Sequence, residues 1–187
     1  MNRLLLIVDP QIDFISGTLP VPGAEAAMDA LAAYVAEQGD SYAVTAVTCD
    51  FHPHDHCSFS GSGGQWPPHC IAHSTGAAVW PALHTALCSS RNPLEMLCKG
   101  QDAQTEEYSI FKNAAARERL RALVVDKGIE RIDVCGIAGD ICVLQTLRDG
   151  VELFGTERFH VLEAFAPSLD GGASLNAFVK ERLICTR

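Results

Sequence analysis

The chain has 187 residues, of which 48% are hydrophobic and 20% charged, and its formal net charge is -9. This length and composition predict a single globular domain spanning residues 1–187. The negative charge argues against nucleic acid or an anionic membrane as a partner, so we expect a small-molecule ligand. No apolar run is long enough for a membrane span or a signal-peptide core, and we therefore expect a cytoplasmic protein.

Apolar strands alternate with helical segments along the chain. Strands of the type buried on both faces are expected at 3–9, 42–49, 94–98, 132–135, 158–163 and 183–185. Helices are expected at 22–39, from Asn113 to 128, after the turn at 136–139, and at 170–181. This alternation predicts a three-layer α/β/α fold with a six-stranded parallel sheet. The His-, Gly-, Ser- and Pro-rich stretch 51–81 is a long loop, which indicates a functional role.

Cys142 follows a predicted strand and a glycine-containing turn, so it falls in the first turn of a helix. The positive end of the helix dipole there favours a thiolate and can receive an oxyanion. The ordinary alternative for any cysteine is a buried structural role. Most of the eight cysteines are expected to be reduced, because disulfide frameworks belong to short secreted chains.

Reactive side chains end several of the predicted strands. Asp9, Asp50, Lys99 and Cys142 each stand at or just beyond the carboxyl end of a different strand, and this edge of an open α/β sheet binds ligands. Asp9 would take the proton of Cys142, while Lys99 favours both charged forms. The thiolate would attack a carbonyl, and the amides of Ala138 and Cys142 would face the developing oxyanion.

A candidate metal site accompanies these residues. Asp50 and His52, two positions apart at a strand end, point the same way, and the distant His69 completes an open site. These donors suit one divalent ion, zinc in the first place, with iron and manganese also compatible. The alternative is a His-rich loop without metal.

Phe14, Trp66 and Tyr108 lie near these groups in the sequence. Flat aromatic side chains beside a metal and a nucleophile indicate a planar substrate held by stacking. Ordinary core packing is the alternative for each of the three.

Together these residues resemble the nicotinamidase (pyrazinamidase) branch of the isochorismatase-like cysteine hydrolases. The resemblance follows the family's order over essentially the whole chain, and the segments that carry it are 9–14, 50–53 with 55–56, 63–70, 99–100, 108–111 and 136–143. It implies an isochorismatase-like (Rossmann-like) fold. It also implies a catalytic triad of Asp9, Lys99 and Cys142 and metal ligands Asp50, His52 and His69.

Further implications of the resemblance concern single positions. His56 matches a position that is a fourth ligand in some members, and a cis peptide bond is implied between Ile137 and Ala138. Gly139 departs from the family, which commonly has a threonine there. The missing side chain is expected to loosen the nucleophile turn.

The resemblance implies hydrolysis of nicotinamide, or a related pyridine carboxamide, to the acid and ammonia through a thioester, as in NAD salvage. The nearest alternative is an amidohydrolase of the same fold that acts on a carbamoyl or ureido substrate. A non-catalytic metal-binding or thiol-sensing protein is an alternative from another class, and a vinyl-ether hydrolase would leave the metal ligands without a task. A homo-oligomer is compatible with the sequence, which leaves the oligomeric state open.

Overall fold

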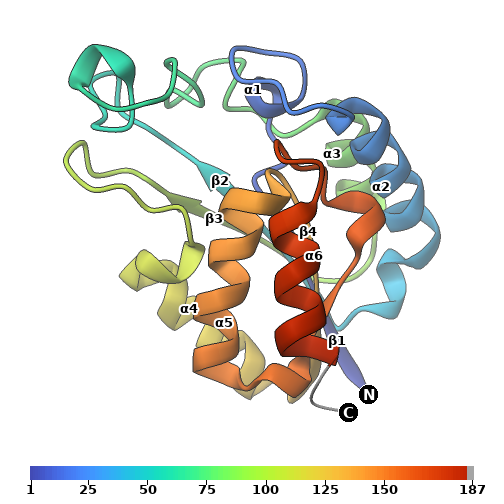
Figure 1. Cartoon of the computed structure of the whole chain (residues 1–187). Helices are drawn as coiled ribbons and strands as arrows, with labels where there is room; N and C mark the ends of the chain where they lie inside the picture. The colour runs from blue at the N-terminus through green and yellow to red at the C-terminus, as the bar shows by residue number, and fades with distance from the viewer. Residues whose placement is uncertain (185–187) are drawn as a thin grey trace.

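The computed structural model describes residues 1–184, and its centre is a parallel sheet of five strands in the order β3-β2-β1-β4-β5 (Figure 1). Every neighbouring pair is parallel. The strands are β1 (Asn2–Val8), β2 (Val44–Asp50), β3 (Leu94–Lys99), β4 (Ile129–Gly136) and β5 (Phe159–Val161). The predicted parallel α/β architecture is therefore confirmed.

Helices cover both faces of the sheet, as the sequence predicts. Figure 1 shows α5 and α6 next to each other in front of the strands, with α2 and α3 on the other side. The α-helices are α1 (Ile12–Ile15), α2 (Ala24–Gln38), α3 (Pro81–Ser89), α4 (Ala114–Asp126), α5 (Leu144–Phe154) and α6 (Ala173–Phe178). Short 3-10 turns are η1 (Gly39–Ser41), η2 (Ser60–Ser62), η3 (Ile110–Lys112), η5 (Thr156–Arg158) and η6 (Glu163–Phe165), and π-helical segments are η4 (Gly139–Val143) and η7 (Val179–Ile184).

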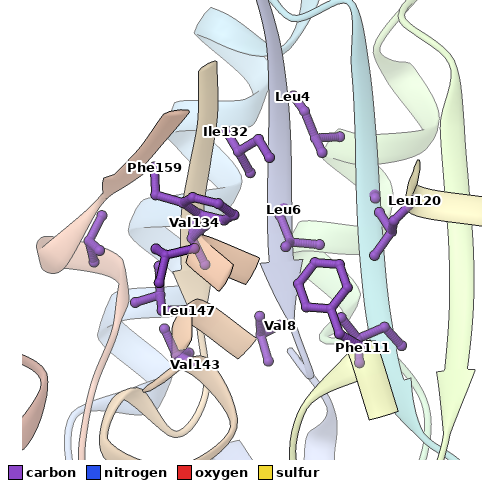
Figure 2. Packing of buried hydrophobic residues seen from close by; sticks show 14 of the residues in the cluster. Leu4, Leu6, Val8, Phe111, Leu120, Ile132, Val134, Val143, Leu147 and Phe159 are labelled. Atoms are coloured by element: carbon purple, nitrogen blue, oxygen red, sulfur yellow. The ribbon is translucent and has the colours of Figure 1, made fainter. Parts of the chain in front are cut away.

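Side-chain alternation along β1 divides the core into two layers. Leu4 and Leu6 point to the face covered by α4, α5 and α6, where Figure 2 shows Leu6 among the side chains of neighbouring strands and helices. Leu5 and Ile7 point to the face covered by α2 and α3. Because both faces are buried, β1 needs a continuous apolar run, which is the pattern read from the sequence.

The predicted sixth strand at 183–185 is wrong for the part that the structure describes. Residues 183 and 184 belong to the π-helical segment Val179–Ile184, while Cys185 lies outside the described residues. An apolar run this short fits the end of a buried helix as well as a strand. Val179 and Leu183 pack against the core from this segment, so the apolar residues serve a helix face.

Local signals set several helix ends. The Asn113 side chain accepts a hydrogen bond from the Ala116 amide at 3.1 Å, which confirms the predicted cap of α4. The sequence analysis missed α3, although Pro81 stands at its first position, where proline is favoured. Within residues 1–184, no helix is both long and apolar enough to cross a bilayer.

The sheet order places the central strand β1 between β2 and β4. The chain runs from β1 to β2 and β3 on one side and then crosses back to β4 and β5 on the other side, so the strand order reverses at β1. This is the point at which an open α/β sheet forms a ligand crevice beyond its carboxyl ends. Residues that follow β1, β2, β3 and β4 therefore meet there.

Replacement of Leu6 by alanine should lower the free energy of unfolding by about 2–5 kcal/mol, because Leu6 is 1% exposed and its removal leaves a cavity. Urea unfolding followed by circular dichroism measures the change. Val125→Ala is the control, since Val125 is 75% exposed. Equal effects of the two substitutions would contradict the assigned core.

Candidate active site and metal centre

Lys99 lies at the centre of the candidate site. Its side chain is 1% exposed, and its Nζ lies 2.9 Å from Asp9 Oδ2 and 3.8 Å from Cys142 Sγ. It also donates a hydrogen bond to Asp50 Oδ1. Asp50 and Lys99 are register partners on β2 and β3, Asp9 directly follows β1, and Cys142 lies in η4 after β4. The structure thus brings together the four reactive residues that the sequence assigned to this edge.

Asp9 is held in a fixed position beside the ammonium group. Its φ is +47°, in the left-handed region that aspartate tolerates better than most residues. The Thr48 hydroxyl donates to Asp9 Oδ1 at 2.6 Å, and the Asp9 amide donates to the Thr48 carbonyl at 3.0 Å. Oδ2 therefore faces Lys99 and the nucleophile side of the site.

Burial disfavours each charged group here, and neighbouring charges decide the outcome. Burial would lower the pKa of Lys99, but Asp50 and Asp9 raise it well above its ordinary value. Burial would raise the pKa of Asp50, but Lys99 and His52 bring it below its ordinary value. Burial raises the pKa of Asp9, and Lys99 offsets only part of this increase. The ammonium group is therefore charged, and Asp9 is the more basic of the two carboxylates.

The resting state of Cys142 differs from the sequence-based expectation of a favoured thiolate. Burial raises the pKa of the Cys142 thiol well above its ordinary value, and Asp9 adds to the increase while Lys99 opposes it. Full burial outweighs the effect of the nearby cation. The thiol must therefore lose its proton to a neighbouring base when it reacts, and Asp9 is the carboxylate beside it.

Asp50, His52 and His69 converge on one point beside Lys99. Their ligand atoms lie within 4.8 Å of one another, and all three side chains are buried. His52 Nδ1 donates to the Gly100 carbonyl at 2.9 Å, and His69 Nδ1 donates to the Pro67 carbonyl at 2.8 Å. In the neutral rings these bonds place the proton on Nδ1 and the lone pair on Nε2, which is the arrangement that metal-binding histidines use, and His52 Nε2 lies 3.6 Å from Asp50 Oδ2. The donor set fits a divalent cation.

The charge balance also favours a cation at this trio. Two buried carboxylates, Asp9 and Asp50, share the single ammonium of Lys99, so the cluster carries excess negative charge. A second group of candidate ligands, formed by Asp9, Asp50 and Cys142, is as compact. Lys99 Nζ contacts all three of these side chains and fills the space among them.

His56 is buried next to the trio, but its ring nitrogens are already engaged. Its Nε2 donates to the Thr105 carbonyl at 3.1 Å, and its Nδ1 accepts from the Ser58 amide at 3.2 Å. Its ring stacks on the His52 ring with centroids 4.0 Å apart. In this structure His56 supports His52, and its role as a fourth ligand stays a prediction.

Supporting residues that the sequence analysis did not assign fix the metal trio. Gln11 is buried, accepts from the Asp50 amide at 2.8 Å and donates to the Asp50 carbonyl at 2.7 Å. Asp13 accepts from the Cys70 amide at 2.7 Å, next to His69. Both residues lie inside the segment 9–14 that carried the family resemblance, which was the available signal. Gln11 thus holds the backbone of the candidate ligand Asp50, and Asp13 holds the backbone of the residue after His69.

The three aromatic residues predicted to bind substrate all line one pocket above Cys142. Phe14 packs at 5.3 Å between ring centroids against His69, and the Trp66 indole N–H donates to the Tyr108 hydroxyl at 3.1 Å. The pocket leaves about 30 Å³ for the centre of a water-sized sphere, and about 410 Å³ when all non-atom space out to the open mouth is included.

Other pocket residues were not predicted: four of them lie outside the motif segments, and Ile141, inside segment 136–143, was assigned no role. Asp50, His69, Ala138 and Cys142 form its inner part, and the unpredicted residues are Leu19, Val21, Glu106, Ile141 and Leu169. Burial raises the pKa of Glu106, the carboxylic acid among them. The remaining four are apolar, so the pocket favours a flat ligand with a polar end.

The nucleophile turn contains the implied cis peptide bond between Ile137 and Ala138. Gly139 is buried and its amide donates to the Pro167 carbonyl at 2.8 Å, and the expectation that this glycine loosens the turn stays a prediction. The backbone there is closely packed. Among residues 1–184, the cysteines are free thiols, in agreement with the expectation of a reduced protein.

The fold and this arrangement define an α/β protein of the cysteine-hydrolase class, with its thiol at the carboxyl edge of a parallel sheet. A model of the isochorismatase domain matches residues 3–164, and the chain belongs to the isochorismatase family.

Relatives and solved structures narrow the comparison. The nicotinamidase/pyrazinamidase of Mycobacterium tuberculosis is 39% identical over 156 residues, which cover 80% of this chain and 78% of that protein. The crystal structure of PnC1 from L. infantum in complex with nicotinate is 33% identical and has a TM-score of 0.81, covering 97% of this chain and 89% of that one. A pyrazinamidase of Pyrococcus horikoshii in complex with zinc is 25% identical, with a TM-score of 0.77 and 97% coverage of both chains.

Replacement of Gly100 by alanine should weaken metal binding at the trio by about 10–100-fold, the range found when a partner of a metal-binding histidine is disturbed. Gly100 has φ +67°, and a Cβ there would lie 2.3 Å from His52 Cε1, so His52 must move. Titration of the metal-free protein with zinc measures the affinity. Gly61→Ala is the control, because a Cβ at Gly61 meets nothing within 4 Å. Unchanged affinity in Gly100→Ala would contradict a metal site at this trio.

Proposed function

We propose that the chain is a metal-dependent cysteine amidohydrolase that converts nicotinamide to nicotinate and ammonia in cytoplasmic NAD salvage. The observation that carries the proposal is one buried side chain, Lys99. Its ammonium group contacts the carboxylate of Asp9 and the thiol of Cys142, and it also pairs with Asp50, a member of the metal trio. An amide carbon above Cys142 and a ring nitrogen facing the trio then fit one flat molecule. The named activities of the relatives support this substrate.

Pocket side chains would hold the substrate ring. Phe14 and Trp66 flank the ring in the proposal, and Tyr108 fixes the Trp66 indole through the hydrogen bond between them. A bound divalent ion would supply a fixed Lewis-acid centre that orients the pyridine nitrogen. We propose zinc, held by Asp50, His52 and His69, with iron and manganese as the ions that the same donors accept.

The first half of the proposed reaction transfers the acyl group to the thiol. The Cys142 proton moves to the Asp9 carboxylate as Sγ forms a bond to the carboxamide carbon, and the carbonyl oxygen takes up the negative charge. The amides of Ala138 and Cys142 stabilise this oxyanion in the proposal. Asp9 then donates its proton to the amide nitrogen and the C–N bond breaks. Ammonia departs, and a thioester remains on Cys142.

The second half restores the thiol. Water attacks the thioester carbon as Asp9 takes one of its protons, so a C–O bond forms and the C–S bond breaks. The proton returns from Asp9 to Cys142 Sγ, and the acid leaves and gives its remaining proton to solvent, which yields nicotinate. Throughout, Lys99 stays protonated and stabilises whichever neighbour is charged, which is consistent with its raised pKa.

Replacement of Cys142 by alanine should abolish ammonia release from nicotinamide, with a loss of at least about 10⁴-fold in kcat, because no other group can form the thioester. Chelation should lower wild-type activity, and added zinc should restore it. Cys88→Ala serves as the control, since Cys88 is exposed on α3. Wild-type protein inactive on nicotinamide, or an active Cys142→Ala variant, would refute the proposed function.

The Thr48→Val substitution should move the acid limb of kcat/KM to higher pH. The Thr48 hydroxyl bond lowers the pKa of Asp9, so its removal raises that pKa further. Asp9 must be a carboxylate to accept the thiol proton, and activity is lost as the pH falls through its pKa. In wild type the limb should already lie above about 3.9, the ordinary aspartate value. An unmoved acid limb would argue against Asp9 as the base.

A further inference from the structure

The segment 166–170 packs directly onto the nucleophile turn. The Gly139 amide donates to the Pro167 carbonyl at 2.8 Å, and Gly139 is buried beneath the segment. A Cβ at Gly139 would lie 2.3 Å from Ser168 Oγ and 2.6 Å from the Ala166 carbonyl oxygen. The second of these atoms belongs to the backbone, so any side chain at Gly139 would displace the segment.

Asp140 binds the same segment further along its backbone. Asp140 Oδ1 accepts from the Leu169 amide and Oδ2 accepts from the Asp170 amide, both at 3.0 Å. Hydrogen bonds to a carboxylate are about twice as strong as neutral ones. Together with the Gly139 bond, they fix the backbone of the segment relative to Cys142, two residues further along the turn.

Leu169 extends from this segment to the mouth of the substrate pocket. It lines the pocket together with Leu19, Val21 and Ile141, and it is 42% exposed. An exposed leucine has no core to stabilise, whereas its position at the pocket mouth gives it contact with any ligand that reaches outward from Cys142. Because hydrogen bonds hold the backbone on both sides of Leu169, the segment keeps this side chain at the pocket mouth.

We propose that segment 166–170 is a fixed wall of the substrate pocket and that Leu169 on it determines which ring substituents the enzyme accepts. The inference rests on the proposed function, since it concerns the ring of a pyridine carboxamide. Ring carbons 2 and 6 flank the nitrogen that faces the metal trio. Carbons 4 and 5 then point toward the open mouth, where Leu169 lies. Leu169 therefore selects against substituents on these two carbons.

The test compares kcat/KM for nicotinamide with kcat/KM for its 4- and 5-methyl and 4- and 5-ethyl derivatives. In Leu169→Ala, the ratio of ethyl-substituted to unsubstituted substrate should rise at least about tenfold for one of the two positions, the effect of a methylene group in an apolar pocket. Leu153→Ala is the matched control, because Leu153 is 40% exposed on α5 and lies outside this pocket. Its ratio should equal that of wild type.

A second variant tests the tether. Asp140→Asn removes one of the two acceptors, so the wall should loosen and the same ratio should rise, with a larger change in KM than in kcat. Asp40→Asn is its control, since Asp40 Oδ1 also accepts from two groups, the Ser90 hydroxyl and the Arg91 amide. The inhibition constant of 5-ethylnicotinate measures the effect of the ethyl group on binding alone, without turnover.

The outcomes separate the two proposals. Wild-type protein that leaves nicotinamide intact refutes the proposed function. Wild-type protein that hydrolyses nicotinamide, combined with ratios in Leu169→Ala within twofold of wild type at both positions, overturns the role of Leu169. An equal loss of activity on all substrates leaves the ratio unchanged and has the same meaning.

Discussion

The buried ammonium group of Lys99 is the interaction on which the site depends. A charge without water is stable only when it is paired, and removing one member of such a pair costs about 3–5 kcal/mol. Lys99 meets this requirement with Asp9 after β1 and Asp50 at the end of β2, while also contacting Cys142. The same contacts link the acid and thiol to the metal trio. One ion pair network therefore sets both the geometry of the sheet edge and the charge state of the reacting groups.

Close approach of the backbone is the second recurring constraint. Gly100 lets its carbonyl reach His52, and Gly139 lets segment 166–170 lie on the nucleophile turn. Each glycine borders a different half of the site. The candidate metal ligands are thus fixed from the side of β3, while the pocket mouth is fixed from the side of η4. In the proposed function, these contacts and carboxylates such as Asp140 supply the preorganisation that catalysis and selectivity need.

Much of the fold and of the candidate site could be predicted because the signals were local or motif-based. Buried strands read as apolar runs, Asn113 reads as a cap, and the reactive residues follow strand ends. The last predicted strand was wrong because a short apolar run fits a buried helix equally well. Packing of the segment against the core decided that it forms a helix. The pKa of Cys142 also ran against expectation, since a favourable helix terminus is visible in sequence whereas complete burial is not.

The sequence by itself determined the α/β class, the order of elements and the residue types at the carboxyl edge of the sheet, because side-chain periodicity and strand termini are properties of the chain alone. Only the tertiary structure decided that His56 turns both ring nitrogens to protein partners, that Thr48 and Gln11 hold the two acids, and that Leu169 reaches the pocket. These facts depend on contacts between segments far apart in the chain. Such contacts arise from packing and burial, which no local pattern encodes.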